Sequence, residues 1–118
     1  MIYTSYFGKY KGDKGVSIAR WTPKWFVGET LLCFAPSADL LHWWKKLTPE
    51  LQHKLDNQMA YAERYNRETL EPLVPHVHEL AKQLEDKVLL CYEKSDDFCH
   101  RHLVANWFCK YGHLCDEL

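Results

Sequence analysis

A glutamate, two cysteines, a histidine and an arginine lie close together in the segment from Cys91 to Arg101. Cys91 and Glu93 end an apolar run, and Cys99 and His100 follow after a short polar stretch. A cysteine thiolate is a strong nucleophile, and histidine or glutamate can move the proton that such chemistry requires. The candidate catalytic residues of a Cys/His-dependent enzyme are therefore Cys99, His100, Glu93 and Cys91.

Arg101 makes the same segment a candidate anion site. The first turn of a helix presents free backbone N–H groups and the positive end of its dipole, and an arginine adds a bidentate contact to phosphate or carboxylate. The structural alternative is that Arg101 pairs with Glu93 or Asp97 and that the neighbouring cysteine packs inward. A phosphatase-type loop is excluded, because Asp97 stands where that loop needs an arginine and no glycine lies between Cys91 and Asp97.

A second group of candidate ligand-binding residues follows the second predicted strand, where arginine and lysine alternate with tryptophan. The cations can hold a phosphate while the indole rings stack on a base or another ring. The alternative is that the tryptophans are core or lid aromatics and that the cations are solvated. Together with two tyrosines at strand ends and the arginine described above, the candidate ligand-binding residues are Tyr6, Arg20, Trp21, Lys24, Trp25, Tyr92 and Arg101.

No metal or cofactor site is expected. Cys99, His100 and His102, with Cys91 as a further candidate, are suitable zinc ligands by residue type. Neighbouring residues on a helix point in different directions, however, so these side chains would rarely share one ion. The chain also lacks a phosphate-binding glycine loop and a dinucleotide-binding motif, because the spacing of its first glycines does not fit either pattern.

Four strands and several helices are predicted to position these residues. Ile2–Phe7 and Val16–Ala19 are rich in β-branched and aromatic residues, and Val88–Tyr92 is apolar on both faces, as is typical of a central parallel strand. His113–Leu118 is expected to form a short edge strand. Apolar spacing and capping residues predict helices at Ala38–Lys46 after Ser37 and from Pro49 to about Tyr65. Pro72 and Pro75 are expected to interrupt the helical pattern, which resumes from Val77 onward. A last helix is predicted at Phe98–Lys110, capped by Ser95 to Asp97 and closed by Gly112.

This succession of elements predicts one α/β domain over residues 1–118. We expect a small, Rossmann-like three-layer sandwich, in which a short and mostly parallel sheet of about four strands is flanked by helices. In such sheets ligands bind beyond the carboxyl ends of the strands. This rule places the expected pocket at residues 5–7, 20–25 and 91–101.

Composition narrows the range of partners. The chain has 118 residues, 47% of them hydrophobic, and a formal net charge of −1, so no general basic surface for nucleic acid or an anionic membrane is expected. No apolar run approaches the roughly 20 residues of a membrane-spanning helix, and the first residues do not resemble a signal peptide. The five cysteines are an odd number without a C-x-x-C pair, which favours free thiols in the cytoplasm.

Segments spread over nearly the whole chain match a known family: Ile2–Tyr6, Ser17–Phe26, Leu32–Leu40, Val88–Lys94 and Phe98–Ala105. They resemble the domain of unknown function 488 family. The resemblance implies a small cytosolic α/β protein, and a phage-encoded member would act in the host cytoplasm. It also implies that the recurring Cys, Glu, Cys, His and Arg of the family fall here on Cys91, Glu93, Cys99, His100 and Arg101.

Three functions remain open. The first is binding of an anionic, ring-bearing, nucleotide-like small molecule, with or without a reaction on it. The second is a Cys/His-dependent enzyme of unknown reaction, and the third is a phage counter-defence protein that sequesters a host immune nucleotide. The aromatic segment Leu40–Trp44 offers a homo-oligomer interface, with core packing as the alternative.

Overall fold

The computed structural model describes residues 1–118 and contains one five-stranded sheet in which every neighbouring pair of strands is parallel. The buried strand β4 lies at its centre, and the C-terminal strand β5 forms one edge, as predicted. The α/β class with a parallel sheet flanked by helices is therefore confirmed. The strands are β1 (Ile2–Tyr6), β2 (Gly15–Ser17), β3 (Glu29–Thr30), β4 (Val88–Cys91) and β5 (Cys115–Glu117), in the spatial order β3-β2-β4-β1-β5.

Strand register brings three chain segments to one end of the sheet. Tyr6, which ends β1, lies opposite Cys91, which ends β4. Ser17, which ends β2, lies opposite Leu90. The segments that follow these strands therefore leave the sheet at the same carboxyl edge, which is the edge where parallel sheets bind ligands.

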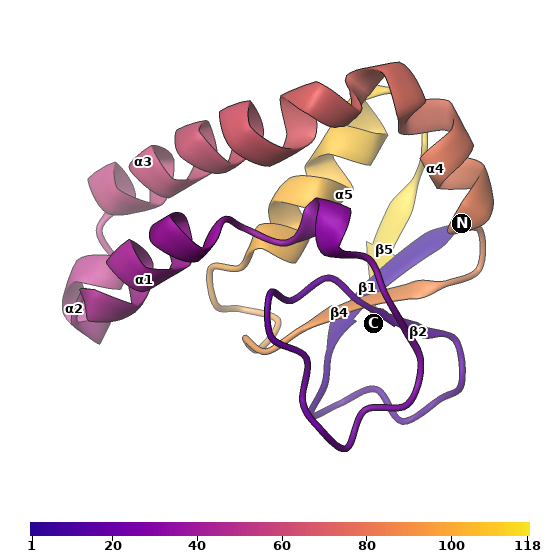
Figure 1. The fold of residues 1–118 in the computed structure, drawn as a ribbon, viewed down its shortest axis with the longest axis horizontal. Helices are drawn as coiled ribbons and strands as arrows, with labels where there is room; N and C mark the ends of the chain where they lie inside the picture. Colours follow the sequence, from indigo (N-terminus) through magenta and orange to yellow (C-terminus); the bar gives the residue numbers. More distant parts are fainter.

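Helices cover one face of the sheet, and loops cover the other (Figure 1). On the helical face, Leu89 packs in a core with Phe34, Tyr65 and Phe108. On the opposite face, Leu90 packs in a smaller cluster whose other members come largely from the loops after β1 and β2. The third layer of the predicted sandwich is thus made by loops. The helices are α1 (Ala38–Lys46), α2 (Pro49–Gln52), α3 (Leu55–Tyr65), α4 (Val77–Gln83) and α5 (His100–Lys110).

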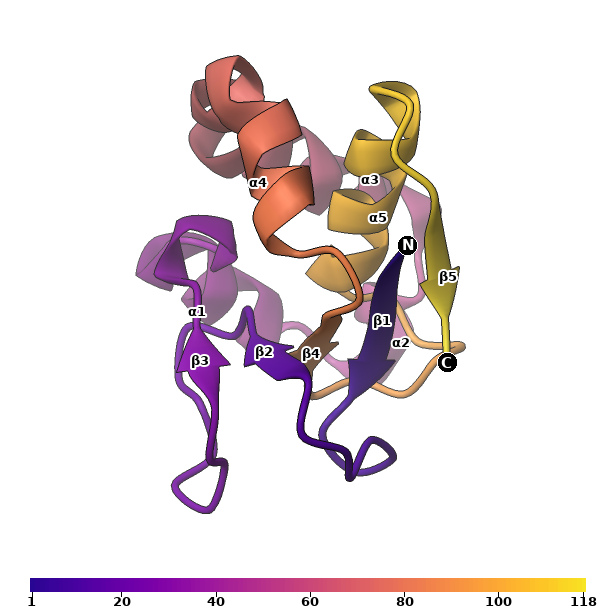
Figure 2. The same cartoon turned by 90° about the vertical axis from the view of Figure 1, so that its right-hand side faces the viewer.

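The chain stays helical between α3 and α4, where prolines were expected to interrupt the pattern. A π-helical turn spans Asn66–Leu70, and a 3-10 segment spans Glu71–His76 and contains both prolines. A further 3-10 turn, Leu32–Phe34, leads from β3 toward α1. Figure 1 shows the continuous helical path from α3 to α4 above the sheet, and Figure 2 shows the chain descending from α4 to β4.

The long helix predicted from Pro49 to Tyr65 is divided in two. Lys54 has extended backbone, and the side chains of Asn57 and Gln58 donate hydrogen bonds of 2.9 and 3.0 Å to the carbonyls of Leu51 and Gln52. The Gln58 amide takes the place of the next helical turn at the carbonyl of Gln52, and the Asn57 amide adds to the bond that the Lys54 N–H donates to the carbonyl of Leu51. Local capping by polar side chains thus outweighs the apolar spacing that predicted one helix.

The last helix begins later than predicted. Cys99 is its N-cap, with extended backbone, whereas Ser95 to Asp97 lie in the preceding turn. Its end agrees with the prediction, because Gly112 has a φ of +87° directly after the helix, where a residue with a β-carbon would be strained. None of the helices has the length and apolar character needed to cross a membrane.

Candidate functional site

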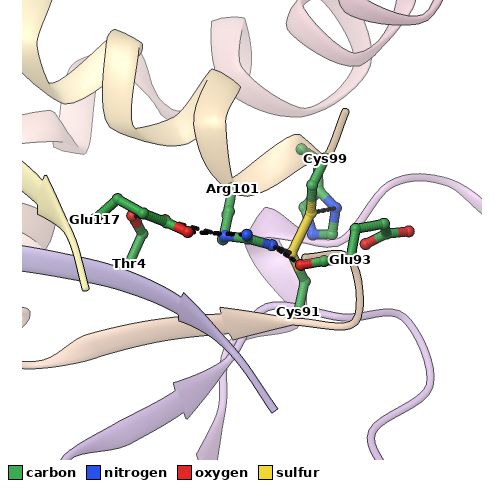
Figure 3. A network of polar contacts seen from close by, with 7 residues as sticks. Thr4, Cys91, Glu93, Cys99, Arg101 and Glu117 are labelled. Atoms are coloured by element: carbon green, nitrogen blue, oxygen red, sulfur yellow. Dashed lines mark hydrogen bonds and ion pairs between the residues drawn. A yellow bond between two sulfur atoms is a disulfide. The ribbon is translucent and has the colours of Figure 1, made fainter. Parts of the chain in front are cut away.

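The site is built around Arg101, a buried arginine in the first turn of α5. Its Nε and Nη2 atoms donate hydrogen bonds of 3.2 and 2.9 Å to the two carboxylate oxygens of Glu117 in β5. Its Nη1 atom donates at 2.6 Å to the backbone carbonyl of Glu93 and at 3.1 Å to Sγ of Cys91. Figure 3 shows the guanidinium held between Glu117 on one side and Cys91 on the other.

Arg101 forms an ion pair, as in the structural alternative, but with a different partner from the two considered there. Neither Glu93 nor Asp97 offers a carboxylate to it; the partner is Glu117, at the far end of the chain. Figure 3 shows the carboxylate of Glu93 pointing away from the guanidinium. Because a buried charge is stable only when it is paired and hydrogen-bonded, Arg101 ties α5 to β4 and β5. Its side chain is fully buried, so Arg101 is not presented to a ligand, contrary to the prediction from the sequence.

Glu117 responds to the same contacts. Burial by itself would raise the pKa of this carboxyl, but the hydrogen bonds from Arg101 and Thr4 favour the charged form and lower the pKa to about 2. The carboxylate therefore stays ionised across the physiological range. The ion pair is a fixed part of the fold at neutral pH.

The two cysteines of the site are joined. A disulfide links Cys91, at the end of β4, to Cys99, at the N-cap of α5. The expectation of five free thiols is therefore wrong for this pair, and it holds for Cys33, Cys109 and Cys115. Sequence spacing gave no sign of the pairing, because it depends on α5 beginning directly above the end of the central strand.

His100 lies beside this sulfur pair and has a fixed tautomer. Its Nε2 atom is 2.7 Å from the carbonyl oxygen of Ile18, which can only accept, so Nε2 carries the proton. Burial, with the nearby charge of Arg101, lowers the pKa of His100 to about 4, so the ring is neutral near pH 7 and Nδ1 is unprotonated. Nδ1 lies 3.8 Å from Sγ of Cys99. We call Cys91, Cys99 and His100 the sulfur–imidazole cluster.

A cavity of about 200 Å³ opens over this cluster. The three cluster residues are buried and form its deep end, whereas Arg20, Lys45, Tyr92 and Trp21 are partly or well exposed and form its mouth. Its walls are mostly apolar and aromatic. The remaining lining residues are Ala19, Pro36, Leu41, Trp44, Tyr61, Glu93 and Phe98.

Two cations and one acid give the mouth its charge. Nε of Arg20 donates a 3.0 Å hydrogen bond to the carbonyl of Pro36, which fixes the guanidinium at the rim. The amino group of Lys45 lies 5.5 Å from the ring centre of Trp21. Burial raises the pKa of the Glu93 carboxyl, although nearby cations act in the opposite direction. The mouth is thus suited to an anion, with an acid beside it that can accept a hydrogen bond.

The structure brings most of the predicted site residues together and leaves others apart. Arg20, Trp21, Tyr92 and Glu93 line the cavity together with the sulfur–imidazole cluster. The candidate ligand-binding residues that do not line it are Tyr6, Lys24, Trp25 and Arg101.

These four residues lie in different environments, and Arg101 is the buried arginine described above. Tyr6 lies beneath Arg101, with its ring centre 5.8 Å from the guanidinium carbon, and Trp25 packs edge-on against Phe7 in the loop layer. Lys24 is exposed to solvent. Arg20 and Trp21 stay at the cavity, whereas the chain has turned away from it by Lys24 and Trp25, which the alternation of cations and tryptophans did not reveal.

Sequence reasoning missed the contribution of α1. Leu41, Trp44 and Lys45 line the cavity from this helix, and Tyr61 does so from α3. Their spacing places Leu41, Trp44 and Lys45 on one helix face, but an aromatic helix face is equally typical of core packing. Glu117 was missed because no local pattern connects the end of the chain to Arg101.

Comparison with known proteins gives one match. A family model described as DUF488-N3a, active DUF488-N3 subclade, matches residues 13–112. No curated protein and no solved structure matches the chain. The matched range contains every residue that lines the cavity, whereas Glu117 and Tyr6 lie outside it.

Proposed function

The chain belongs to the DUF488 family, and we propose that it binds one small, anionic, ring-bearing molecule of nucleotide-like chemistry in the cavity over the sulfur–imidazole cluster. The observation that carries the proposal is the combination of aromatic walls with two cations at the mouth. A ring would enter between the aromatic side chains, and its anionic group would stay near Arg20 and Lys45. The proposed setting is the cytoplasm, where Cys91 and Cys99 would be held reduced.

Cavity size limits the ligand. At about 200 Å³ the cavity lies below the roughly 300–1,000 Å³ that is usual for ligand pockets. It suits a single ring with a small anionic group at the open mouth, and it is too small to enclose a dinucleotide. A polymer is also disfavoured, because the net charge of the chain is −1 and the two cations are confined to one rim.

The aromatic side chains at the mouth are held in place without a ligand. The Tyr92 hydroxyl donates a 2.6 Å hydrogen bond to the carbonyl of Trp21, and the Trp21 ring stacks on His42 at 5.8 Å between ring centres. A preformed aromatic surface loses little conformational entropy when a ring stacks on it. Glu93, at the same rim, would accept hydrogen bonds from sugar hydroxyls or base amino groups.

A second function, thiol-dependent catalysis, is favoured by one contact. Nδ1 of His100 is unprotonated and lies 3.8 Å from Sγ of Cys99, so in the reduced protein it would accept a hydrogen bond from that thiol and orient it. Arg101 donates to Cys91 and would stabilise a thiolate there. The word "active" in the description of the matched subclade agrees with such a reaction.

Binding is tested by calorimetric titration of the reduced protein with a panel of nucleoside monophosphates. Arg20→Ala should weaken the Kd of the best binder about tenfold or more, because a charge-assisted hydrogen bond is lost. The matched control is Lys24→Ala, which removes a nearby exposed cation outside the cavity. Absence of binding across the panel, or equal weakening by both variants, would overturn the proposal.

Mass spectrometry of the recovered ligand then separates the remaining alternatives. A converted ligand indicates the enzyme, whereas an unchanged ligand indicates binding or sequestration. A phage counter-defence role would require the unchanged outcome with an immune signalling nucleotide. Catalysis by the cluster further requires that Cys99→Ser abolish conversion while the variant still binds the ligand.

A further inference from the structure

The sulfur–imidazole cluster has the residue types and spacing of a zinc site. The ligand atoms of Cys91, Cys99 and His100 all lie within 4.8 Å of one another. With Zn–S bonds of about 2.3 Å and Zn–N bonds of about 2.0–2.1 Å, two ligands of a tetrahedral ion are roughly 3.5–3.8 Å apart. The separation of 3.8 Å between Sγ of Cys99 and Nδ1 of His100 already meets this condition. We infer that the reduced cluster binds one Zn²⁺ ion.

Backbone geometry explains why the neighbouring residues Cys99 and His100 can share an ion. Two successive residues within a helix diverge, which is why no metal site was expected from the sequence. Cys99, however, is the N-cap and has extended backbone, with a φ of −152° and a ψ of 147°, so its side chain is not directed as a helical residue would be. The divergence of neighbouring residues within a helix therefore does not prevent Cys99 and His100 from sharing an ion.

The surrounding contacts prepare each ligand for a metal. Nε2 of His100 donates to the carbonyl of Ile18 at 2.7 Å, which leaves Nδ1 as the free ligand atom and fixes the ring. Zinc-binding histidines commonly hold their second nitrogen in this way. Nη1 of Arg101 donates at 3.1 Å to Sγ of Cys91, which would stabilise that sulfur as a thiolate.

The charges near the cluster also balance. Arg101 carries one positive charge close to the proposed ion, but the carboxylate of Glu117 neutralises it through two hydrogen bonds. The charge of Zn²⁺ is then matched by the thiolates of Cys91 and Cys99. Glu93, Arg20 and Lys45 face the cavity farther out, at its mouth.

Metal binding requires the reduced form of the cysteines. Opening the disulfide consumes two electrons and two protons from a thiol reductant, and coordination of Zn²⁺ then releases two protons as both thiols become thiolates. The Cα atoms of Cys91 and Cys99 are 7.6 Å apart, beyond the roughly 4.4–6.8 Å that disulfides usually span. Two separate thiolates around an ion fit this wider spacing.

The fourth coordination position would face the cavity, because all three protein ligands line it. Three protein ligands and one open position are the arrangement of catalytic zinc sites, where the open position takes water or a substrate atom. Here it would take water or the anionic group of the ligand. This last step rests on the proposed function, whereas the metal site itself does not.

The test uses the full chain, reduced with a phosphine, incubated with Zn²⁺ and passed through a desalting column. Elemental analysis should find one Zn²⁺ per chain, and the oxidised protein should retain none. Co²⁺ in place of Zn²⁺ should give a thiolate-to-metal charge-transfer band and the intense visible bands of tetrahedral coordination. A reduced protein that shows neither the bound zinc nor the cobalt spectrum would overturn the inference.

Variants identify the ligands. Cys91→Ser, Cys99→Ser and His100→Gln should each weaken the Zn²⁺ Kd by about tenfold or more. Cys33→Ser and Cys109→Ser remove exposed thiols and should leave the Kd unchanged. Equal weakening by the control variants would contradict the site, and the cobalt spectrum of the wild-type protein decides the question if a ligand variant fails to fold.

A nucleotide titration of the metal-free, reduced protein separates this inference from the proposed function. Nucleotide binding without any retention of Zn²⁺ or Co²⁺ would overturn the metal site and leave the ligand pocket standing. Metal retention without nucleotide binding, with or without zinc present, would overturn the proposed ligand and leave the metal site standing.

Discussion

The guanidinium of Arg101 and the carboxylate of Glu117 form a bidentate ion pair that joins α5 to the edge strand β5. The arginine side chain is fully buried, and the glutamate side chain is 27% exposed. Removing one member of a buried pair leaves an uncompensated charge inside the protein. The last residues of the chain therefore stabilise the strand end and helix start that form the deep end of the cavity.

Glu117→Gln should lower the free energy of unfolding by about 2–4 kcal/mol, below the usual value for a fully buried pair because Glu117 is partly exposed. Urea denaturation followed by circular dichroism measures this change. Glu63→Gln is the control, since Glu63 pairs with Arg67 at 3.9 Å on the helix surface, and surface pairs contribute little. A similar small effect in both variants would show that the Arg101 pair is not structurally important.

The same ion pair predicts how stability depends on acid. Burial raises the pKa of Glu117, but hydrogen bonds from Arg101 and Thr4 outweigh burial and lower the pKa to about 2, from its ordinary value of 4.5. The unfolded chain then binds the proton more readily, so the contribution of Glu117 is present above about pH 4.5 and is lost as the pH falls toward 2. The stability difference between wild type and Glu117→Gln should therefore shrink between pH 5 and about pH 2. A difference that stays constant over this range would contradict the assigned pKa.

Sequence reasoning identified the central strand, the α1 helix with its Ser37 cap, and the approximate position of the pocket. These depend on local signals: an apolar run, a capping residue, and the rule that parallel sheets bind ligands at the carboxyl edge. Seven of the predicted site residues line the cavity: Arg20, Trp21, Cys91, Tyr92, Glu93, Cys99 and His100. They were recovered because they end a strand, come shortly after one, or open the next helix.

The contacts that were missed join residues far apart in the chain. Glu117 reaches Arg101 only because β5 adds beside β1, and the Cys91–Cys99 bond forms only because α5 starts at His100 instead of Phe98. Lys45 reaches the cavity because α1 packs over it. Long-range pairing and the exact start of a helix are decided by tertiary packing, which residue spacing does not encode.

Cysteine labelling should distinguish two of the free thiols, Cys109 and Cys115, from each other. Burial, together with the neighbouring Cys109 thiol, raises the pKa of Cys115 to about 12, whereas Cys109 is exposed. Because the thiolate is the reactive form, iodoacetamide should modify Cys109 much faster than Cys115 in the folded, oxidised protein. Peptide mass spectrometry over time measures both rates. Equal rates in the folded state would contradict the burial of Cys115, and both thiols should react similarly in denaturant.

Two stacked tyrosines offer a matched test of stability. The hydroxyl of Tyr65 donates a 2.6 Å hydrogen bond to the carbonyl of Phe34 inside the core, and Tyr61 lines the cavity. Tyr65→Phe leaves a buried carbonyl without its partner and should cost about 1–3 kcal/mol of stability. Tyr61→Phe should change stability much less. Thermal unfolding of both variants checks this, and a larger loss for Tyr61→Phe would refute the assignment of the core bond.

Trp21 and Trp25 provide the sharpest test of where the ligand binds. Both are well exposed, at 49% and 61%, and they are close in sequence, but only Trp21 lines the cavity. If Trp21 stacks on the ring of the ligand, Trp21→Ala should cost about 1–3 kcal/mol of binding free energy, which is roughly a 5- to 150-fold weaker Kd. Trp25→Ala removes an equal aromatic surface from the neighbouring loop and should leave the Kd nearly unchanged.

Calorimetric titration with the same nucleoside monophosphate measures both values, and circular dichroism shows whether each variant is folded. Trp25 packs against Phe7, so a modest loss of stability in Trp25→Ala is expected without a loss of affinity. Stronger weakening of binding by Trp25→Ala than by Trp21→Ala would place the ligand on the loop face of the sheet. The cavity over the sulfur–imidazole cluster would then not be the binding site, because only the residues on its own side of the sheet can contact a molecule inside it.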